Sequence, residues 1–210
     1  KGEINNIVNA AGISGDSPDA TARRVLEIDA LGTVNAVKCF YPLLGKDSVQ
    51  INISSMGRFT AVLWGITEEQ VIPHFANWAK ESFVDDVMQL IPDNEKGPDM
   101  AYSLSKIFVY WFSMKNVRRY ADKGARIVTI SPGHYNTRMM QRIAECKPEI
   151  TEGMRRANPM GRWGEPEEIG ALAEFICGPS GTYLNGIDIL TDGGFTVANI
   201  SQREEQLPSV

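Results

Sequence analysis

The sequence predicts an α/β fold in which a parallel sheet is covered by helices on both faces. Short apolar runs rich in β-branched residues alternate with longer segments whose apolar residues recur near helical spacing. The short runs are apolar throughout instead of at every second residue, which is typical of strands buried on both faces. With 210 residues, the chain is expected to form one domain, residues 1–210.

The elements of this fold follow one another in a regular order. Strands are predicted where apolar runs are bounded by Gly, Asn or Pro, at residues 4–8, 49–53, 125–130 and 186–190. Helices are predicted over residues 21–44 and 102–122, where the apolar residues form stripes at helical spacing. A further helix is expected to begin near Pro166.

Residues 56–101 interrupt the alternation and are predicted to form a helical insert. They are far more numerous than the ~2 to 6 residues that usually connect such elements. Thr67 to Gln70 has the pattern of a capping box, and apolar residues then follow at mostly four-residue steps as far as Pro92, which predicts one helix. The insert either packs against the body of the domain or forms a substrate lid, with Trp64, Phe75 or Trp78 facing a ligand.

Composition excludes several classes of protein. The chain has 26 acidic and 21 basic residues, a net charge of −5, so it lacks the basic footprint of proteins that bind nucleic acid or anionic membranes. Its three cysteines, Cys39, Cys146 and Cys177, lie far apart, which predicts a reducing compartment and neither a disulfide framework nor a metal site. No run approaches the ~20 apolar residues that span a bilayer. We therefore expect a soluble, cytoplasmic protein.

The start of the chain suggests that an N-terminal part is missing. Lys1 is not a methionine, and the first predicted strand begins almost at once. The N-terminus also lacks the charged head and apolar core of a signal peptide.

Tyr102 and Lys106, in the run YSLSK, are candidate catalytic residues. Their spacing of four places both on one face of a helix, about one turn apart. An ammonium at ~4 to 6 Å favours the ionised form of a phenol, so Tyr102 could donate and accept a proton near neutral pH. The spacing by itself also arises by chance on many surface helices.

Further candidate residues follow the ends of three predicted strands, where open α/β sheets bind their ligands. Ser54 and Ser55 end the second strand, and one of these hydroxyls could hydrogen-bond a substrate oxygen. Taken alone, such a pair often satisfies only the backbone of a loop. The other two groups are Asn9, Ala10, Ala11 and Gly12 after the first strand, and Ser131, Pro132 and Gly133, followed by Thr137, after the third.

In this order, the motifs resemble those of the short-chain dehydrogenase/reductase family. The motifs appear in the family's order and extend across nearly the whole chain. They are NAAG, NISS, YSLSK, SPG with Thr137, GRWGEPEE and a final DGG. The resemblance implies a Rossmann-like doubly wound parallel sheet. It also implies an NAD- or NADP-dependent oxidoreductase that interconverts a secondary alcohol and a ketone by hydride transfer.

The resemblance also implies roles for individual residues. Tyr102 would be the catalytic acid and base, Lys106 would favour its ionised form and hold the nicotinamide ribose, and Ser55 would orient the substrate carbonyl. Asp29 stands where the family has an Asn whose backbone helps to hold a water on a proton relay. The backbone carbonyl of Asp29 can still hold this water, because the side chain is not involved. The charge of its carboxylate can perturb Lys106. The remaining cofactor-binding residues would be Asn9, Ala10, Ala11 and Gly12 on the adenosine side, and Pro132, Gly133, Tyr135 and Thr137 at the nicotinamide.

Two departures from the family pattern bear on activity and substrate. The glycine-rich turn TGxxxGxG is absent, so about 60 or more residues of βαβ type are expected to be missing. We therefore expect the 210-residue polypeptide to be inactive by itself. The preference for NAD or NADP also stays open, because the residue that reads the ribose 2′ position would lie in the missing part. The long insert resembles that of 3-alpha-hydroxysteroid dehydrogenase/carbonyl reductases and monomeric carbonyl reductases, which act on bulky hydrophobic carbonyls. With the stretch from Thr137 to Met140, it favours a steroid or a similar substrate.

The sequence leaves alternative functions and assemblies open. A serine hydrolase would have only His74 and His134 as bases and lacks a G-x-S-x-G elbow. A non-catalytic binding or scaffold protein on the same fold is the stronger rival, although Ser55, Tyr102 and Lys106 are intact. We expect a homodimer formed through the last strand, with a tetramer or a monomer also possible.

Overall fold

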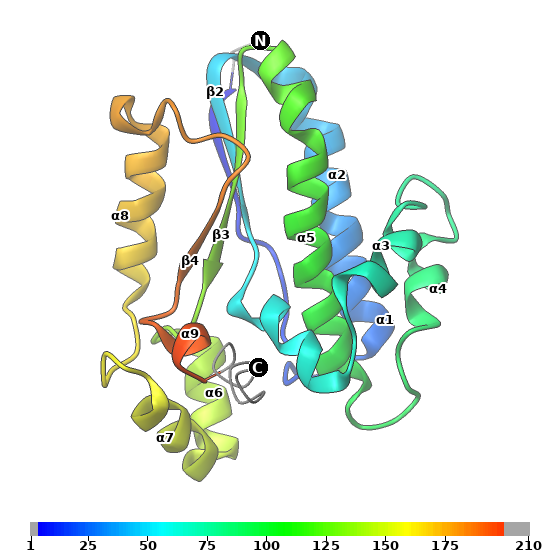
Figure 1. Ribbon diagram of the computed structural model, residues 1–210, viewed down its shortest axis with the longest axis vertical. Coiled ribbons are helices and arrows are strands. Elements are labelled where there is room, and N and C mark those ends of the chain that lie inside the picture. The colour runs from blue at the N-terminus through cyan, green and yellow to red at the C-terminus, as the bar shows by residue number, and fades with distance from the viewer. Residues whose placement is uncertain (1–3, 200–210) are drawn as a thin grey trace, which may run out of the picture.

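A computed structural model describes residues 4–199, without the side chains of residues 62–64 and 68, so the predicted lid role of the Trp64 side chain lies outside the described residues. The described part contains one sheet of four parallel strands in the order β1-β2-β3-β4 (Figure 1). The strands are β1 (Ile4–Asn9), β2 (Leu44–Ile53), β3 (Arg126–Pro132) and β4 (Asp188–Thr191). The predicted parallel α/β fold is confirmed.

Helices cover both faces of the sheet. Helix α8 (Pro166–Cys177) lies on one face, and α2 (Gly32–Phe40) and α5 (Gly97–Asp122) lie on the other (Figure 1). On the α8 side, Ile176 packs in a buried cluster with Val49, Ile51, Val128 and Ile130. Burial on both faces stabilises the parallel arrangement, as the apolar runs predicted.

Strand β2 differs from the predicted pattern because its face toward α5 is polar. Gln50 and Asn52 are fully buried there. Gln50 Oε1 accepts a hydrogen bond from Tyr120 Oη at 2.6 Å, and Asn52 Nδ2 donates to Ser113 Oγ at 2.9 Å. These bonds compensate for the loss of hydration, so the buried polar groups attach α5 to the sheet in one register.

The predicted helix over residues 21–44 is helical but not one regular helix. It consists of α1 (Ala22–Val25), a π-helical turn (Leu26–Leu31), α2, and a 3₁₀ turn (Tyr41–Leu43), and Leu44 already belongs to β2. Thr21 caps α1 by accepting a hydrogen bond from the Arg24 amide at 3.2 Å. The π-helical turn carries Asp29, and such turns occur frequently at functional sites.

The insert contains two short helices, so the prediction of one helix ending at Pro92 was wrong. A 3₁₀ segment (Met56–Trp64) leads to α3 (Glu68–Phe75) and α4 (Phe83–Met88), and the predicted capping box at the start of α3 is present. Pro73 lacks an N–H group and weakens the end of α3. His74 Nδ1 then hydrogen-bonds the Asp86 carbonyl at 2.7 Å, which attaches α3 to α4.

The aromatic residues of the insert pack against α5. The ring of Phe75 lies 5.2 Å from that of Phe108 in an edge-to-face arrangement, and the ring of Trp78 lies 5.0 Å from that of Phe112. Helices α3 and α4 lie beyond α5 and α1, away from the sheet (Figure 1). Of the two alternatives for the insert, the structure shows packing for Phe75 and Trp78. Helix α5 begins at Gly97, so the final residues of the predicted insert belong to it.

Of the remaining elements, α6 (Arg138–Cys146), α7 (Pro148–Ala157) and α9 (Phe195–Asn199) lie around the carboxyl ends of the strands. A 3₁₀ turn (Pro179–Gly181) lies at the opposite end, where Arg126 at the start of β3 donates a hydrogen bond to the Gly181 carbonyl at 2.7 Å. Helices α6, α7 and α9 lie at one end of the sheet (Figure 1). No helix within residues 4–199 is both long and apolar enough to cross a membrane.

Candidate active site

A cavity of about 460 Å³ opens at the carboxyl ends of the strands. It brings together most of the residues that the sequence singled out, namely Ala10, Gly12, Ser55, Tyr102, Lys106, Pro132, Gly133, Tyr135 and Thr137. Asn9, Ala11 and Asp29 are not part of its wall. The parallel topology explains the convergence, because all strands end at the same edge of the sheet.

Tyr102 and Lys106 project from the first half of α5. The end of β2 holds this part of the helix in place, because Ser54 Oγ donates a hydrogen bond to the Lys106 carbonyl at 2.8 Å. Lys106 Nζ lies 5.3 Å from the centre of the Tyr102 ring. The predicted pair therefore shares one wall of the cavity.

Ser55 stands beside Tyr102, with Gly57 between them. Ser55 Oγ accepts a hydrogen bond from the Gly57 amide at 3.0 Å, which leaves its proton available to a ligand. A Cβ atom on Gly57 would lie 2.9 Å from Tyr102 Cε1 and 3.3 Å from Ser55 Oγ. A side chain at position 57 would therefore force one of the two neighbours to shift.

Asp29 lies behind Lys106 and forms a buried ion pair with it. Lys106 Nζ is 3.0 Å from Asp29 Oδ2, and the side chains are 7% and 0% exposed. Asp29 Oδ1 accepts a hydrogen bond from the Ile13 amide at 2.8 Å, so the π-helical turn, the loop after β1 and α5 meet at one carboxylate. Burial lowers the pKa of Lys106, but the charges of Tyr102 and Asp29 outweigh it, and the pKa lies above its ordinary value.

Gly12 packs directly on this ion pair. A Cβ atom at position 12 would lie 3.2 Å from both Lys106 Nζ and Asp29 Oδ2. Asn9 lies deeper, where its Nδ2 donates weakly to Thr33 Oγ1 and to Asn52 Oδ1, each at 3.4 Å. The loop after β1 thus contributes small residues to the cavity and an amide side chain to the buried polar network beneath it.

The segment after β3 forms the opposite wall. Gly133 approaches Asp192 so closely that a Cβ atom would lie 2.5 Å from the Asp192 Cβ. Thr137 caps α6 by accepting a hydrogen bond from the Met140 amide at 3.3 Å. Helix α6 then places Met139, Met140 and Ile143 in the cavity wall.

The cavity also contains residues that no motif indicated. The loop after Gly12, the segment after Ser55 and the start of α5 contribute Ile13, Ser14, Gly15, Asp16, Met56, Thr60 and Asp99. Burial and then the charge of Asp16 raise the pKa of Asp99, while Lys147 opposes them. Lys147 Nζ is paired with Asp16 Oδ1 at 2.6 Å. The only sequence signal for these positions was their nearness to a motif.

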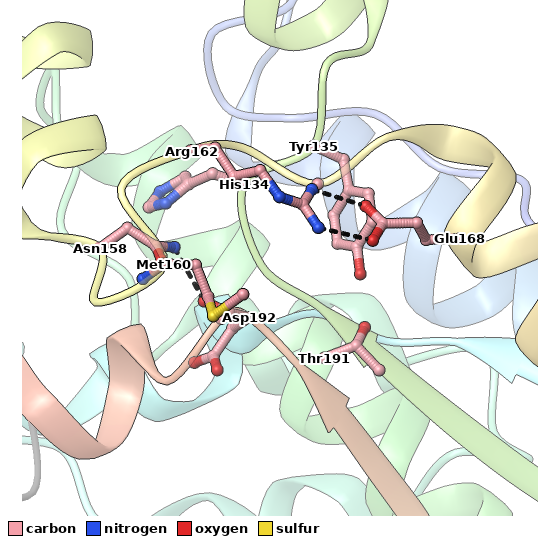
Figure 2. A pocket seen from close by; sticks show the side chains of 10 residues that line it. His134, Tyr135, Asn158, Met160, Arg162, Glu168, Thr191 and Asp192 are labelled. Atoms are coloured by element: carbon pink, nitrogen blue, oxygen red, sulfur yellow. Dashed lines mark hydrogen bonds and ion pairs between the residues drawn. The ribbon is translucent and has the colours of Figure 1, made fainter.

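The late glycine-rich motif surrounds a second, smaller cavity of about 230 Å³ (Figure 2). Arg162 and Glu168 form a bidentate ion pair at its edge, in which Arg162 Nη1 donates to Glu168 Oε2 at 2.9 Å and Arg162 Nη2 donates to Glu168 Oε1 at 2.8 Å. His134 and Tyr135 line both this cavity and the larger one. Burial lowers the pKa of His134, although the charge of Asp192 opposes the effect, so neutral imidazole is favoured.

Comparisons of the sequence with known proteins identify similar oxidoreductases. A family model described as "Enoyl-(Acyl carrier protein) reductase" matches residues 93–196. Galactitol 2-dehydrogenase (L-tagatose-forming) of Cereibacter sphaeroides is 36% identical over 97 residues, which are 46% of this chain and 38% of that protein. Short-chain dehydrogenase/reductase bsc3 of Alternaria brassicicola is 28% identical over 194 residues, 92% of this chain and 69% of the relative. In the galactitol dehydrogenase comparison, the match spans well under half of the relative's length.

Solved structures of low sequence identity share the fold. The 3-alpha-hydroxysteroid dehydrogenase of Pseudomonas sp. B-0831, complexed with NADH, has a TM-score of 0.77 and 21% identity, over 95% of this chain and 76% of that one. RhlG of Pseudomonas aeruginosa, in an NADP active-site complex, has a TM-score of 0.66 and 24% identity, over 93% and 66% of the two chains. The family model and the curated relatives agree with the predicted resemblance to the short-chain dehydrogenase/reductase family, and the solved structures share the fold of this chain.

Proposed function

We propose that the protein interconverts a secondary alcohol and a ketone by hydride transfer with NAD or NADP. One observation carries the proposal: Ser55, Tyr102 and Lys106 come from two separate segments and line one cavity. A hydroxyl donor, a phenol and an ammonium are the groups that reversible protonation of a carbonyl oxygen requires.

The cavity fits the nicotinamide and ribose end of such a cofactor. Gly12 and Gly133 line the cavity without side chains of their own, so a cofactor can approach the backbone closely, and Lys106 contributes an ammonium that ribose hydroxyls could bind. Around the nicotinamide we place Pro132, Gly133, Tyr135 and Thr137, and toward the adenosine the segment Asn9, Ala10, Ala11 and Gly12. The bound nicotinamide would supply or accept the hydride.

In this proposal, the protein supplies the proton and the orientation. Ser55 Oγ–H hydrogen-bonds the substrate oxygen, and Tyr102 Oη donates a proton to it during reduction or removes one during oxidation. The positive charge of Lys106 favours the ionised phenol, and the buried carboxylate of Asp29 keeps Lys106 charged and in place. No TGxxxGxG turn occurs in the 210 residues, so we propose that turnover requires residues beyond them.

The apolar side of the cavity favours a bulky hydrophobic carbonyl, such as a steroid. Ile13, Met56, Met139, Met140 and Ile143 all lie in its wall. Methionine side chains adapt to irregular apolar shapes, which suits a large ring system. The family resemblance at the insert points to the same class of substrate.

A direct experiment tests the proposed function. The full-length protein is mixed with NADH or NADPH and a panel of steroid and aliphatic ketones, and nicotinamide oxidation is followed by absorbance. We expect ketone-dependent oxidation that Tyr102→Phe eliminates. Cofactor binding without turnover of any ketone or alcohol would instead support the rival function, a non-catalytic binding protein on the same fold.

A further inference from the structure

A second buried ion pair, Arg58 with Asp188, lies next to the candidate active site. Arg58 Nη2 is 3.0 Å and Arg58 Nε is 3.3 Å from Asp188 Oδ2, and the side chains are only 11% and 6% exposed. Arg58 follows Ser55 by three residues, and Asp188 begins β4. The pair therefore connects the catalytic-serine loop, residues 54–58, to the sheet.

The same carboxylate also holds the end of β3. Asp188 Oδ1 accepts hydrogen bonds from Thr129 Oγ1 at 2.7 Å and from Ser131 Oγ at 2.8 Å. Ser131 directly precedes Pro132 and Gly133, which line the opposite wall of the cavity. One buried carboxylate is thus bonded to both segments that face each other across the site.

The guanidinium group of Arg58 extends this connection to α5. It lies 3.9 Å from the centre of the Phe59 ring and 4.2 Å from that of Tyr110. Tyr110 follows Lys106 by four residues and therefore lies on nearly the same face of α5. Arg58 contacts the helix that carries both Tyr102 and Lys106.

Stability alone does not explain a buried ion pair at this place. Removing two charges from water is expensive, and apolar residues of similar volume often stabilise a protein as much or more. A planar guanidinium paired with a carboxylate does provide a fixed direction. Its bonds to segments that border the cavity favour a role in geometry.

We propose that Arg58 and Asp188 are positioning residues, which hold the catalytic-serine loop at a fixed place relative to the Ser131–Gly133 segment. This inference rests on the proposed function, in which Ser55 orients the substrate carbonyl and Gly133 borders the nicotinamide. The pair then sets the distance between the substrate carbon and the hydride, although it touches neither. Displacements of ~1 Å caused from outside the reacting groups can lower a rate by about 10²-fold.

The first test separates positioning from stability. The double variant Arg58→Met/Asp188→Asn removes both charges together, so no unpaired charge remains buried. We expect kcat to fall about 10- to 100-fold in the full-length protein, with KM for the cofactor within about twofold and the melting temperature close to the wild-type value. The matched control is Arg118→Met/Asp122→Asn, which removes an exposed ion pair of 2.8 Å on α5 and should leave kcat unchanged.

Activity that is unaltered in a stably folded double variant would overturn the proposal. The same conclusion would follow if kcat fell only in proportion to the unfolded fraction. A wild-type protein without any oxidoreductase turnover would refute the proposed function, and a second measurement keeps the two failures distinct.

That second measurement is hydrogen exchange, which needs no substrate. The Gly57 amide donates to Ser55 Oγ at 3.0 Å, and the Gly133 amide donates to the Thr191 carbonyl at 2.9 Å. In Asp188→Asn we expect faster exchange at both amides, because one carboxylate holds both segments. The exposed-pair control should exchange like the wild type. Unchanged exchange at either amide would show that Asp188 does not connect the two segments.

Discussion

Lys106 Nζ lies 3.0 Å from Asp29 Oδ2, and both side chains are almost completely removed from solvent. The ammonium that faces Tyr102 thus has a carboxylate on its other side. Asp29 favours the charged form of Lys106 and at the same time weakens the positive field at the phenol. The carboxylate at position 29, which the sequence showed as a departure from the family pattern, therefore affects both members of the candidate pair.

Replacing Asp29 with asparagine tests this balance. The amide keeps an acceptor for the Ile13 N–H but removes the negative charge. Without that charge, Lys106 loses its proton at lower pH, because the carboxylate no longer opposes the effect of burial on its pKa. We expect the alkaline limb of the pH profile of kcat/KM for alcohol oxidation to move to lower pH in the full-length protein.

An unchanged profile, or one displaced toward alkaline pH, would contradict this electrostatic role for Asp29. Asp122→Asn is the matched control, since Asp122 is exposed and forms an ion pair with Arg118 at 2.8 Å. The raised pKa of Lys106 also determines how the ion pair's contribution to the free energy of unfolding depends on pH. This contribution is fully present below the ordinary lysine pKa of 10.5. It is lost as the pH rises through the higher pKa of Lys106 in the folded state.

Tyr102→Phe removes the hydroxyl and leaves the ring in place. If Tyr102 transfers the proton, kcat should fall by about 10²- to 10⁴-fold, while cofactor affinity stays close to that of the wild type. Steady-state kinetics and calorimetric titration with the dinucleotide measure the two quantities. Turnover within a few-fold of the wild type would eliminate Tyr102 as the acid and base.

Lys106→Ala should affect both turnover and cofactor binding. One ammonium serves the phenol and the ribose, and loss of a hydrogen bond to a charged group removes about 1.5 to 3 kcal/mol, or roughly 10- to 100-fold in affinity. The same two measurements are compared with those on Tyr102→Phe. A variant in which only one property changes would show that Lys106 does not have the dual role.

Much of this arrangement could be predicted from the sequence. Apolar runs located the four strands, and parallel topology then required the residues after them, including Ser55 and Gly133, to meet at one edge. The spacing of Tyr102 and Lys106 placed them on one helix face, as α5 shows. Periodicity and chain direction determine these features, so no tertiary information was needed.

Other features depend on packing between distant segments. Nothing local to Asp188 or Arg58 indicates that they pair across 130 positions of sequence. The turn between α3 and α4 interrupts an apolar pattern that continues through it, and the hydrogen bond from Asn77 Nδ2 to Asp86 Oδ2 helps to hold the resulting bend. In such places, tertiary contacts override local propensity.

Gly57→Ala tests how closely Ser55 and Tyr102 are packed. The added methyl group would lie 2.9 Å from Tyr102 Cε1, so the ring or the serine loop must shift. We expect kcat to fall by about tenfold or more, because a small displacement of a reacting group has a large effect on rate. Gly153→Ala on α7 adds the same methyl group with no heavy atom within 4 Å and should leave kcat unchanged. Equal activities of the two variants would contradict close packing at Gly57.

The insert also bears on how subunits associate. In the family resemblance, helices equivalent to residues 21–44 and 102–122 pair across a two-fold axis in a four-helix bundle. Here the insert packs on α5, where Phe75 contacts Phe108. A two-fold interface uses the same patch on both subunits, so the obstruction acts twice. We therefore expect the full-length protein not to form this bundle.

The region around α8 and β4 is the alternative surface for association. Within the described residues it exposes large apolar side chains, with Phe175 at 49%, Ile187 at 40% and Tyr183 at 100%. Apolar groups that gather at one edge favour an interface. We expect the full-length protein to be a homodimer through this edge, and Phe175→Asp to convert it to a monomer in light scattering, whereas Ile72→Asp on α3 should leave the dimer intact. A tetramer mass, together with an interface on the outer side of α5, would show that the insert moves away from α5 and that the surface around α8 is not the principal contact.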